Sequence, residues 1–127
     1  MANGRPLTAS NIRYLLTMRE LDPDGQGVRC RDMAAALGLT SPSVHNMMDT
    51  FVEMGLIDKG TSGAAFFTDE GADVARRYTR YYRAVTALLT ASFPGAERVQ
   101  TAACFLLAEL PEDSLDALCE QTNEIRR

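Results

Sequence analysis

Residues 30–55 read CRDMAAALGLTSPSVHNMMDTFVEMG, and this run predicts two short helices joined by a tight turn. Gly38 stands where a first helix over residues 30–37 would end, because glycine readily adopts the left-handed conformation that closes a helix. Pro42 follows two hydroxyl residues that can cap a second helix over residues 42–54, and its missing N–H costs nothing in a first turn. So short a connection holds two helices at a steep angle.

The segments on either side of this run complete a mostly α-helical chain. Gly-Thr-Ser-Gly at residues 60–63 forms a tight connection between two short strands, as in a β-hairpin. Apolar residues recur at helical spacing before and after these segments. The other predicted elements are a helix over residues 8–21, strands over residues 56–59 and 64–67, and helices over residues 68–92, 96–109 and from 111 onward.

Helix, turn, helix and hairpin is the order of a winged helix-turn-helix, a fold that binds DNA in many proteins. We therefore expect a mostly α fold with two parts. Residues 1–70 would form the winged helix-turn-helix DNA-binding domain, and residues 71–127 a helical dimerisation domain.

The second helix of the motif would enter the major groove and read base edges with its first turns. The apolar stripe that we expect to be buried consists of Val44, Met47, Met48, Phe51 and Val52. Side chains outside this stripe are small or polar, and an asparagine amide can form two hydrogen bonds with adenine. The predicted base contacts are Ser41, Pro42, Ser43, His45 and Asn46, with Asp49 on the same face.

Arg29, Arg31, Lys59 and Thr61 are the predicted contacts to the DNA backbone, because cations and hydroxyls bind phosphates. The net charge of the chain is −4. The first 67 residues sum to −1, with six Lys and Arg against seven Asp and Glu. This balance argues against non-specific coating of nucleic acid, which counterion release drives. It leaves open sequence-specific binding and, as the alternative, a winged-helix module that binds protein and has no DNA-binding activity.

Other classes of protein find no support in the sequence. No apolar run approaches the roughly 20 residues of a membrane span, and the first residues lack the apolar core of an export signal, so we expect a cytoplasmic protein. No Gly-rich phosphate loop, nucleophile elbow or acid–base pair indicates an enzyme. Cys30, Cys104 and Cys119 are odd in number and lack metal-site spacing, which predicts free thiols.

Several runs carry a resemblance to a known family: RDMAAALGLTSPSVHNMM (31–48), EMGLI (53–57), FTDEG (67–71), RRYTRYYR (76–83) and LPEDSLD (110–116). In these runs the chain resembles the diphtheria toxin repressor family, the iron- and manganese-dependent regulators of bacteria and archaea. The likeness extends from about Leu7 to Glu120. It is similar to the short, manganese-type architecture without an SH3-like domain.

The resemblance implies a regulator of transcription, with repression expected, that binds palindromic operators as a homodimer. In the family the first three helices and the wing bind DNA, while later helices form the dimer interface and the metal site. The residues that we expect to divide between core and dimer interface are Tyr78, Tyr81, Val85, Leu88, Phe105 and Leu106.

The resemblance also implies manganese or iron as corepressor, but the ligand set is missing. The positions that match the family's metal ligands are Arg13, Tyr82, Cys104, Leu107 and Ala108, of which only Cys104 is a ligand type. We therefore predict no metal site and no cofactor. The chain would be constitutively competent, or gated by an organic ligand between the lobes or by oxidation of Cys104. A small buried residue is the other interpretation of Cys104.

Overall fold

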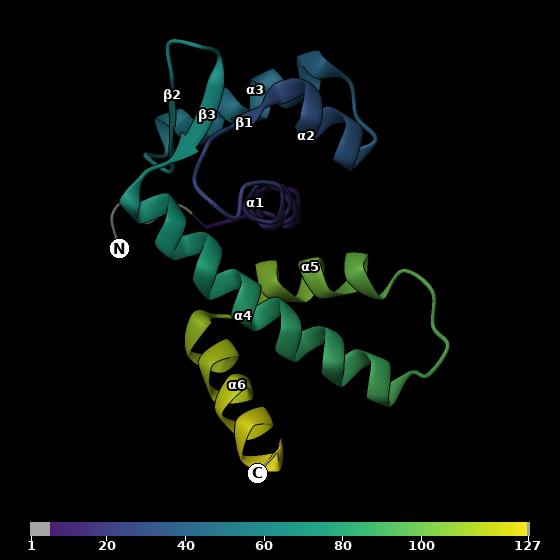
Figure 1. The fold of residues 1–127 in the computed structure, drawn as a ribbon. Helices are drawn as coiled ribbons and strands as arrows, with labels where there is room; N and C mark the ends of the chain where they lie inside the picture. Colours follow the sequence, from purple (N-terminus) through teal and green to yellow (C-terminus); the bar gives the residue numbers. More distant parts are fainter. Residues whose placement is uncertain (1–5, 127) are drawn as a thin grey trace. The chain divides into compact units, whose positions relative to one another are not determined.

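The structure, a computed structural model, describes residues 6–126, with side chains as far as Thr122 (Figure 1). The outermost residues of the two predicted domains, 1–5 and 127, lie outside the described residues. The elements in chain order are α1 (Ala9–Leu21), β1 (Val28–Arg29), α2 (Cys30–Leu37), α3 (Ser41–Glu53), β2 (Ile57–Lys59), β3 (Ala64–Phe67), α4 (Asp69–Ser92), α5 (Val99–Glu109) and α6 (Glu112–Arg126). The predicted mostly α-helical winged helix-turn-helix is confirmed. Among the described residues, no helix combines the length and the apolar character needed to cross a membrane.

The chain divides into two compact units. The N-terminal unit is Arg13–Arg76 and holds the helix-turn-helix and the hairpin. The helical unit is Pro6–Ile12 together with the residues from Arg77 onward. Both divisions fall inside helices, because α1 and α4 each begin in one unit and end in the other.

The sheet of the N-terminal unit has three strands, one more than the sequence predicts. β1, of two residues, pairs antiparallel with β3, which also pairs antiparallel with β2, so the strand order is β1-β3-β2. Two residues are too few to show the alternation that marks a strand in a sequence. β1 leads directly into α2 and so ties the helix-turn-helix to the hairpin.

The core of the N-terminal unit is built from α1, α2, α3 and β2. Leu15, Met33, Met48, Phe51 and Ile57 are each at most 1% exposed. The predicted stripe of α3 is correct at Val44, Met48 and Phe51 and wrong at Val52, which is 41% exposed. The buried positions fall at intervals of four and three residues, and Val52 lies beyond the edge of that stripe.

In the helical unit, polar contacts join α4 and α6. The guanidinium of Arg77 donates to both carboxylate oxygens of Glu112, at 3.1 and 3.4 Å. The buried Tyr81 hydroxyl lies 2.8 Å from Asp116 Oδ1. Burial and this hydrogen bond both hold the pKa of Tyr81 well above its usual value, so the phenol stays protonated and donates. α6 is thereby fixed on α4 by directional bonds.

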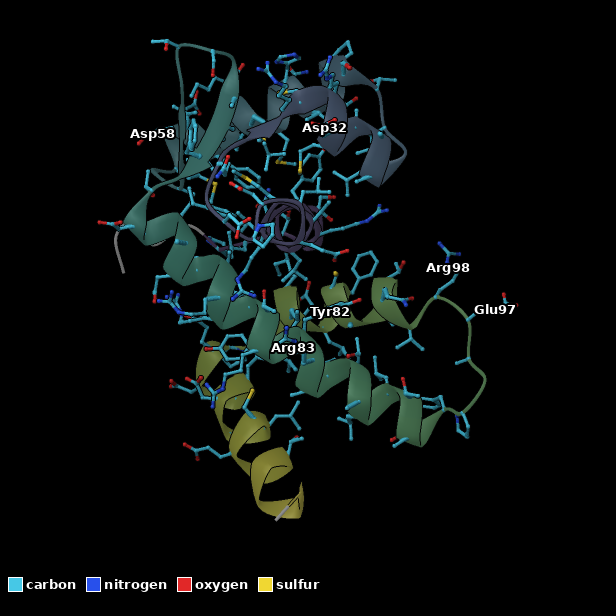
Figure 2. The ribbon with its side chains drawn as sticks, in the orientation of Figure 1. Asp32, Asp58, Tyr82, Arg83, Glu97 and Arg98 are labelled. Carbon is cyan, nitrogen blue, oxygen red and sulfur yellow. The ribbon has the colours of Figure 1, made fainter. Side chains whose placement is uncertain are left out.

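α5 begins at Val99, three residues later than the spacing predicts. Ala96 N–H donates to the Phe93 carbonyl in a turn, and Arg98 has a φ of +63°. A residue with positive φ breaks the α-helical path, so the helix starts after it. Figure 2 shows Glu97 and Arg98 on this connecting loop, with side chains extended away from it.

The start of α4 packs directly on the backbone between α3 and β2. The Thr68 hydroxyl donates to the Gly55 carbonyl at 2.7 Å and accepts from the Gly71 N–H at 3.0 Å, which caps α4. A Cβ on Gly71 would overlap the carbonyl group of Leu56. Only glycine fits this close approach.

Gly71→Ala should therefore lower the free energy of unfolding, by about 1–3 kcal/mol, because the new methyl must displace the main chain at Leu56. Helix propensity alone would give the opposite sign, a gain of about 1 kcal/mol. Urea denaturation followed by circular dichroism measures the change. The control is Ala87→Gly at an exposed position of the same helix, which should cost only about 1 kcal/mol. A Gly71→Ala protein as stable as the parent would contradict this packing.

Candidate nucleic-acid interface

The first turn of α3 is fixed by a side-chain cap. Thr40 has extended backbone dihedrals, and its Oγ1 accepts from the Ser43 N–H at 3.3 Å. The Thr40 hydroxyl donates to Ser43 Oγ at 3.0 Å, and Pro42 occupies the first turn. The first turn of α3 is therefore capped by a residue of its own chain, without any ligand.

One face of α3 is open. Val44 and Met48 are buried at 0% exposure, which turns the opposite side of the helix outward. All five predicted base contacts lie on that exposed side: Ser41, Pro42, Ser43, His45 and Asn46. These residues are all exposed within the first two turns of α3, and all but Pro42 are polar.

Cys30 is a neighbour of this surface that the sequence interpretation did not include. It is half-buried at the start of α2, and its Sγ lies 3.5 Å from Nδ1 of His45, within hydrogen-bond distance. Burial raises the pKa of the thiol most, and the carboxylate of Asp49 raises it further, against a lowering by Lys59. Cys30 is thus a protonated thiol at neutral pH, and its contact limits the orientations of the His45 ring.

Lys59 and Asp49 form an ion pair that joins the hairpin to α3. The sequence interpretation placed Lys59 on a phosphate and Asp49 on the reading face as separate groups. Both side chains remain accessible, at 42% and 62% exposure. A phosphate that approaches Lys59 would therefore meet an ammonium group that a carboxylate already partly neutralises.

Arg29 connects the other side of the hairpin to the helix-turn-helix. Its guanidinium donates to the Ser62 carbonyl at 3.1 Å, across the connection that carries the exposed Thr61. Arg29 is also the residue before α2, where its side chain makes no cap hydrogen bond. Arg31, the fourth predicted backbone contact, is exposed on α2.

The charges around this surface are nearly balanced. The cations Arg29, Arg31 and Lys59 share the helix-turn-helix and hairpin with four exposed carboxylates: Asp32 on α2, Asp49 and Glu53 on α3, and Asp58 on β2. Figure 2 labels Asp32 and Asp58 on these elements. The affinity of this surface for nucleic acid would depend more on individual, geometrically specific contacts than on net charge.

The residues at the family's metal positions do not form a donor set. Arg13 donates to the carbonyl of Leu37 at 3.5 Å, where a cation suits the end of α2. Cys104 and Leu107 are buried in α5, and Tyr82 and Ala108 are half-buried. Within residues 6–122 no group of three or more His, Cys, Asp and Glu side chains could hold a metal ion. Arginine, leucine and alanine offer no metal donor, so the residues present do not fit manganese or iron.

Comparison with known proteins supports the helix-turn-helix. The model of the IclR helix-turn-helix domain matches residues 13–60, less than half of the 127 residues. A search of curated proteins gave no match.

Solved structures with the same fold cover nearly the whole chain. IdeR of T. acidophilum is 22% identical over 94% of this chain, with a TM-score of 0.70. The manganese regulator SloR is 18% identical over 94%, with a TM-score of 0.76. A hypothetical protein from Sulfolobus solfataricus is 22% identical over 93% of this chain and 91% of its own, with a TM-score of 0.63.

At sequence identities of 18–22%, the similarity to these solved structures shows the fold of the chain. The predicted resemblance to the diphtheria toxin repressor family is confirmed at the level of the fold, since a manganese regulator and a metal-dependent transcriptional regulator are among the structural neighbours. The chain spans about half the length of IdeR and SloR, 55% and 54%.

The Lys59–Asp49 pair predicts the effect of removing one charge. Asp49→Asn should tighten binding to duplex DNA by roughly three- to tenfold at low salt, because it frees Lys59 and removes a negative charge from the reading face. The slope of affinity against salt should steepen by about one phosphate contact. Fluorescence anisotropy with a labelled duplex measures both.

Glu53→Gln is the matched control for this change, since Glu53 is an exposed carboxylate at the far end of the same helix. It should change affinity much less than Asp49→Asn. Equal effects of the two substitutions would show that only the net charge matters and that the pair has no role at the interface.

Proposed function

We propose that the chain is a sequence-specific, DNA-binding transcriptional regulator and acts as a repressor on palindromic operators. The observation that carries this is the exposed polar face on the capped first turns of α3, beside a hairpin tied to the same unit. No enzymatic activity is proposed. Regulation of a chromosome places the protein with the DNA, which in a bacterium or archaeon is the cytoplasm.

Each predicted contact has a role in this proposal. Asn46 is long enough to bond the N6 and N7 edge of adenine in the major groove. His45, oriented by the Cys30 thiol, would contact a neighbouring base. Ser41, Pro42 and Ser43 would allow close approach of the backbone. Arg29, Arg31, Lys59 and Thr61 would contact phosphates from α2 and the hairpin.

A homodimer is the second part of the proposal. In the helical unit, Tyr78, Tyr81 and Val85 are buried, whereas Leu88 is 49%, Phe105 60% and Leu106 37% exposed. The six candidates thus separate into three core residues and three available for an interface. Exposed side chains of this size are costly in water and common in subunit contacts. A two-fold dimer would present two copies of α3 to the two halves of a palindrome.

We do not assign to this chain the metal ions of its structural neighbours. SloR is described as a manganese regulator, and ScaR has been solved with bound Zn2+. We infer that this chain does not use the corresponding site, because Arg13, Tyr82, Leu107 and Ala108 supply neither an imidazole nor a carboxylate. Control of DNA binding, if present, would need another signal.

The alternative function is a winged-helix module that binds protein. The four exposed carboxylates that outnumber the three cations on the helix-turn-helix and hairpin favour it, as does the net charge of −4. A surface with this balance of charges would bind a protein partner more readily than a polyanion such as DNA.

Selection from a random duplex library distinguishes the two functions. We expect enrichment of an inverted repeat whose half-sites are centred one helical turn apart, about 10 base pairs, or a multiple of it. Asn46→Ala should weaken binding to the selected site by about 1–3 kcal/mol and leave non-specific duplex unchanged. Enrichment of no sequence at low salt would overturn the regulator and favour the protein-binding module.

Sedimentation equilibrium tests the dimer. The chain should be dimeric at micromolar concentration, and Phe105→Glu should make it monomeric, because a carboxylate replaces an exposed apolar ring. Gln100→Glu, an exposed position on the same helix, is the control and should stay dimeric. A monomeric parent protein, or a dimer that tolerates Phe105→Glu, would contradict the proposed interface.

A further inference from the structure

A hollow in the N-terminal unit lies away from the predicted base contacts. It opens where the end of α1, the loop that follows, β3 and the early part of α4 come together, with a volume of about 460 Å³. This volume is within the usual range of small-molecule sites. Two arginines, Arg19 and Arg76, and two aromatic residues, Phe66 and Phe67, are among its lining residues. Such a lining combines positive charge with apolar surface.

Arg19 is the main reason to expect a ligand. It is half-buried in the last turn of α1 and, in the part of the chain that the structure describes, its guanidinium has neither a hydrogen bond nor an ion pair. A partly buried cation without a partner is costly unless an anion reaches it. Arg76 at the other side of the hollow is exposed and shares its charge with Asp73, at 2.8 Å.

Asp22 is the one carboxylate among the lining residues, and its oxygens are already engaged. Oδ1 accepts from the Gln26 N–H at 2.7 Å, and Oδ2 accepts from the Gly27 N–H at 2.9 Å. These bonds fix the loop after α1 in an Asx-type turn. Asp22 therefore stabilises the loop that forms part of the wall, and the Arg19 guanidinium remains available to an external anion.

The apolar part of the wall is rigid. A Cβ on Gly27 would lie 2.8 Å from Phe66 Cζ, and a Cβ on Gly60 would lie 2.9 Å from Phe66 Cε2. The Phe66 ring is therefore packed against the main chain at both glycines. Phe66 is half-buried and lines the hollow, so the part of its ring that remains accessible is held in place for contact with a second aromatic group at little cost in entropy.

We propose that this hollow binds a small aromatic carboxylate, with its carboxylate on Arg19 and its ring on the phenylalanine side. The guanidinium favours a planar, two-oxygen anion, which it can bind with two parallel hydrogen bonds. A metal cation would be repelled by the two arginines, and inorganic phosphate would leave the aromatic surface without a partner. None of the residues that line the hollow is a predicted DNA contact, so the site can be tested without DNA.

Amide chemical shifts of the labelled protein test the site with three probes. Benzoate has both the charge and the ring, benzamide has the ring alone, and acetate has the charge alone. Benzoate at millimolar concentration should give saturable shifts at the amides of Gly25, Phe66 and Ala72, which line the hollow. Benzamide and acetate should bind roughly tenfold more weakly, because each lacks one of the two contacts.

Arg19→Gln should abolish the benzoate shifts, and Arg83→Gln, an exposed arginine on α4 outside the hollow (Figure 2), should leave them unchanged. If Arg19→Gln failed to fold, the three-probe comparison on the parent protein would still decide the matter. Absence of saturable shifts with benzoate would overturn the proposal. So would equal binding of benzamide, or full binding by a folded Arg19→Gln protein.

Discussion

The backbone at Leu56 is the constraint on which the candidate interface depends. Its N–H donates to the Phe51 carbonyl at the end of α3, and its carbonyl accepts from the Thr68 N–H at 3.0 Å, just before α4. The lack of a side chain on Gly71 lets the first turn of α4 lie against the same peptide. One residue thus sets the end of α3, the start of the hairpin and the start of α4, and through them the place of the hairpin beside α3.

Two further contacts hold the hairpin beside α3. They also engage two of the cations on this surface. Arg29 fixes the connection of the hairpin through the Ser62 carbonyl, and Lys59 fixes its base through Asp49. Two of the three cations expected on phosphates, Arg29 and Lys59, are therefore also structural. Their positions are determined in advance, which lowers the entropy lost on binding, but their electrostatic attraction is reduced. A surface of this kind favours selective contact over strong non-specific attraction.

Sequence signals that act within one turn predict most of the fold. They do not predict contacts between residues that are distant in the sequence. Gly38, the cap at Thr40 and Pro42 marked the helix-turn-helix because each acts within one turn of its own position. β1 was missed because its two residues become a strand only through β3, far along the chain. For the candidate site, helical spacing placed Asn46 and His45 outward correctly. The Cys30–His45 contact and the Lys59–Asp49 pair depend on tertiary structure, although opposite charges on either side of the turn at Gly55 were a usable signal for the second.

The central claim is that α3 and the hairpin form one surface that binds duplex DNA. Hydrogen–deuterium exchange with and without a saturating selected duplex tests it most directly, since it reports which amides a ligand protects. We expect protection over residues 41–50 and over the hairpin connection at 60–63, with α6 unchanged. Protection confined to α5 and α6, or none at any segment in the presence of bound duplex, would contradict it.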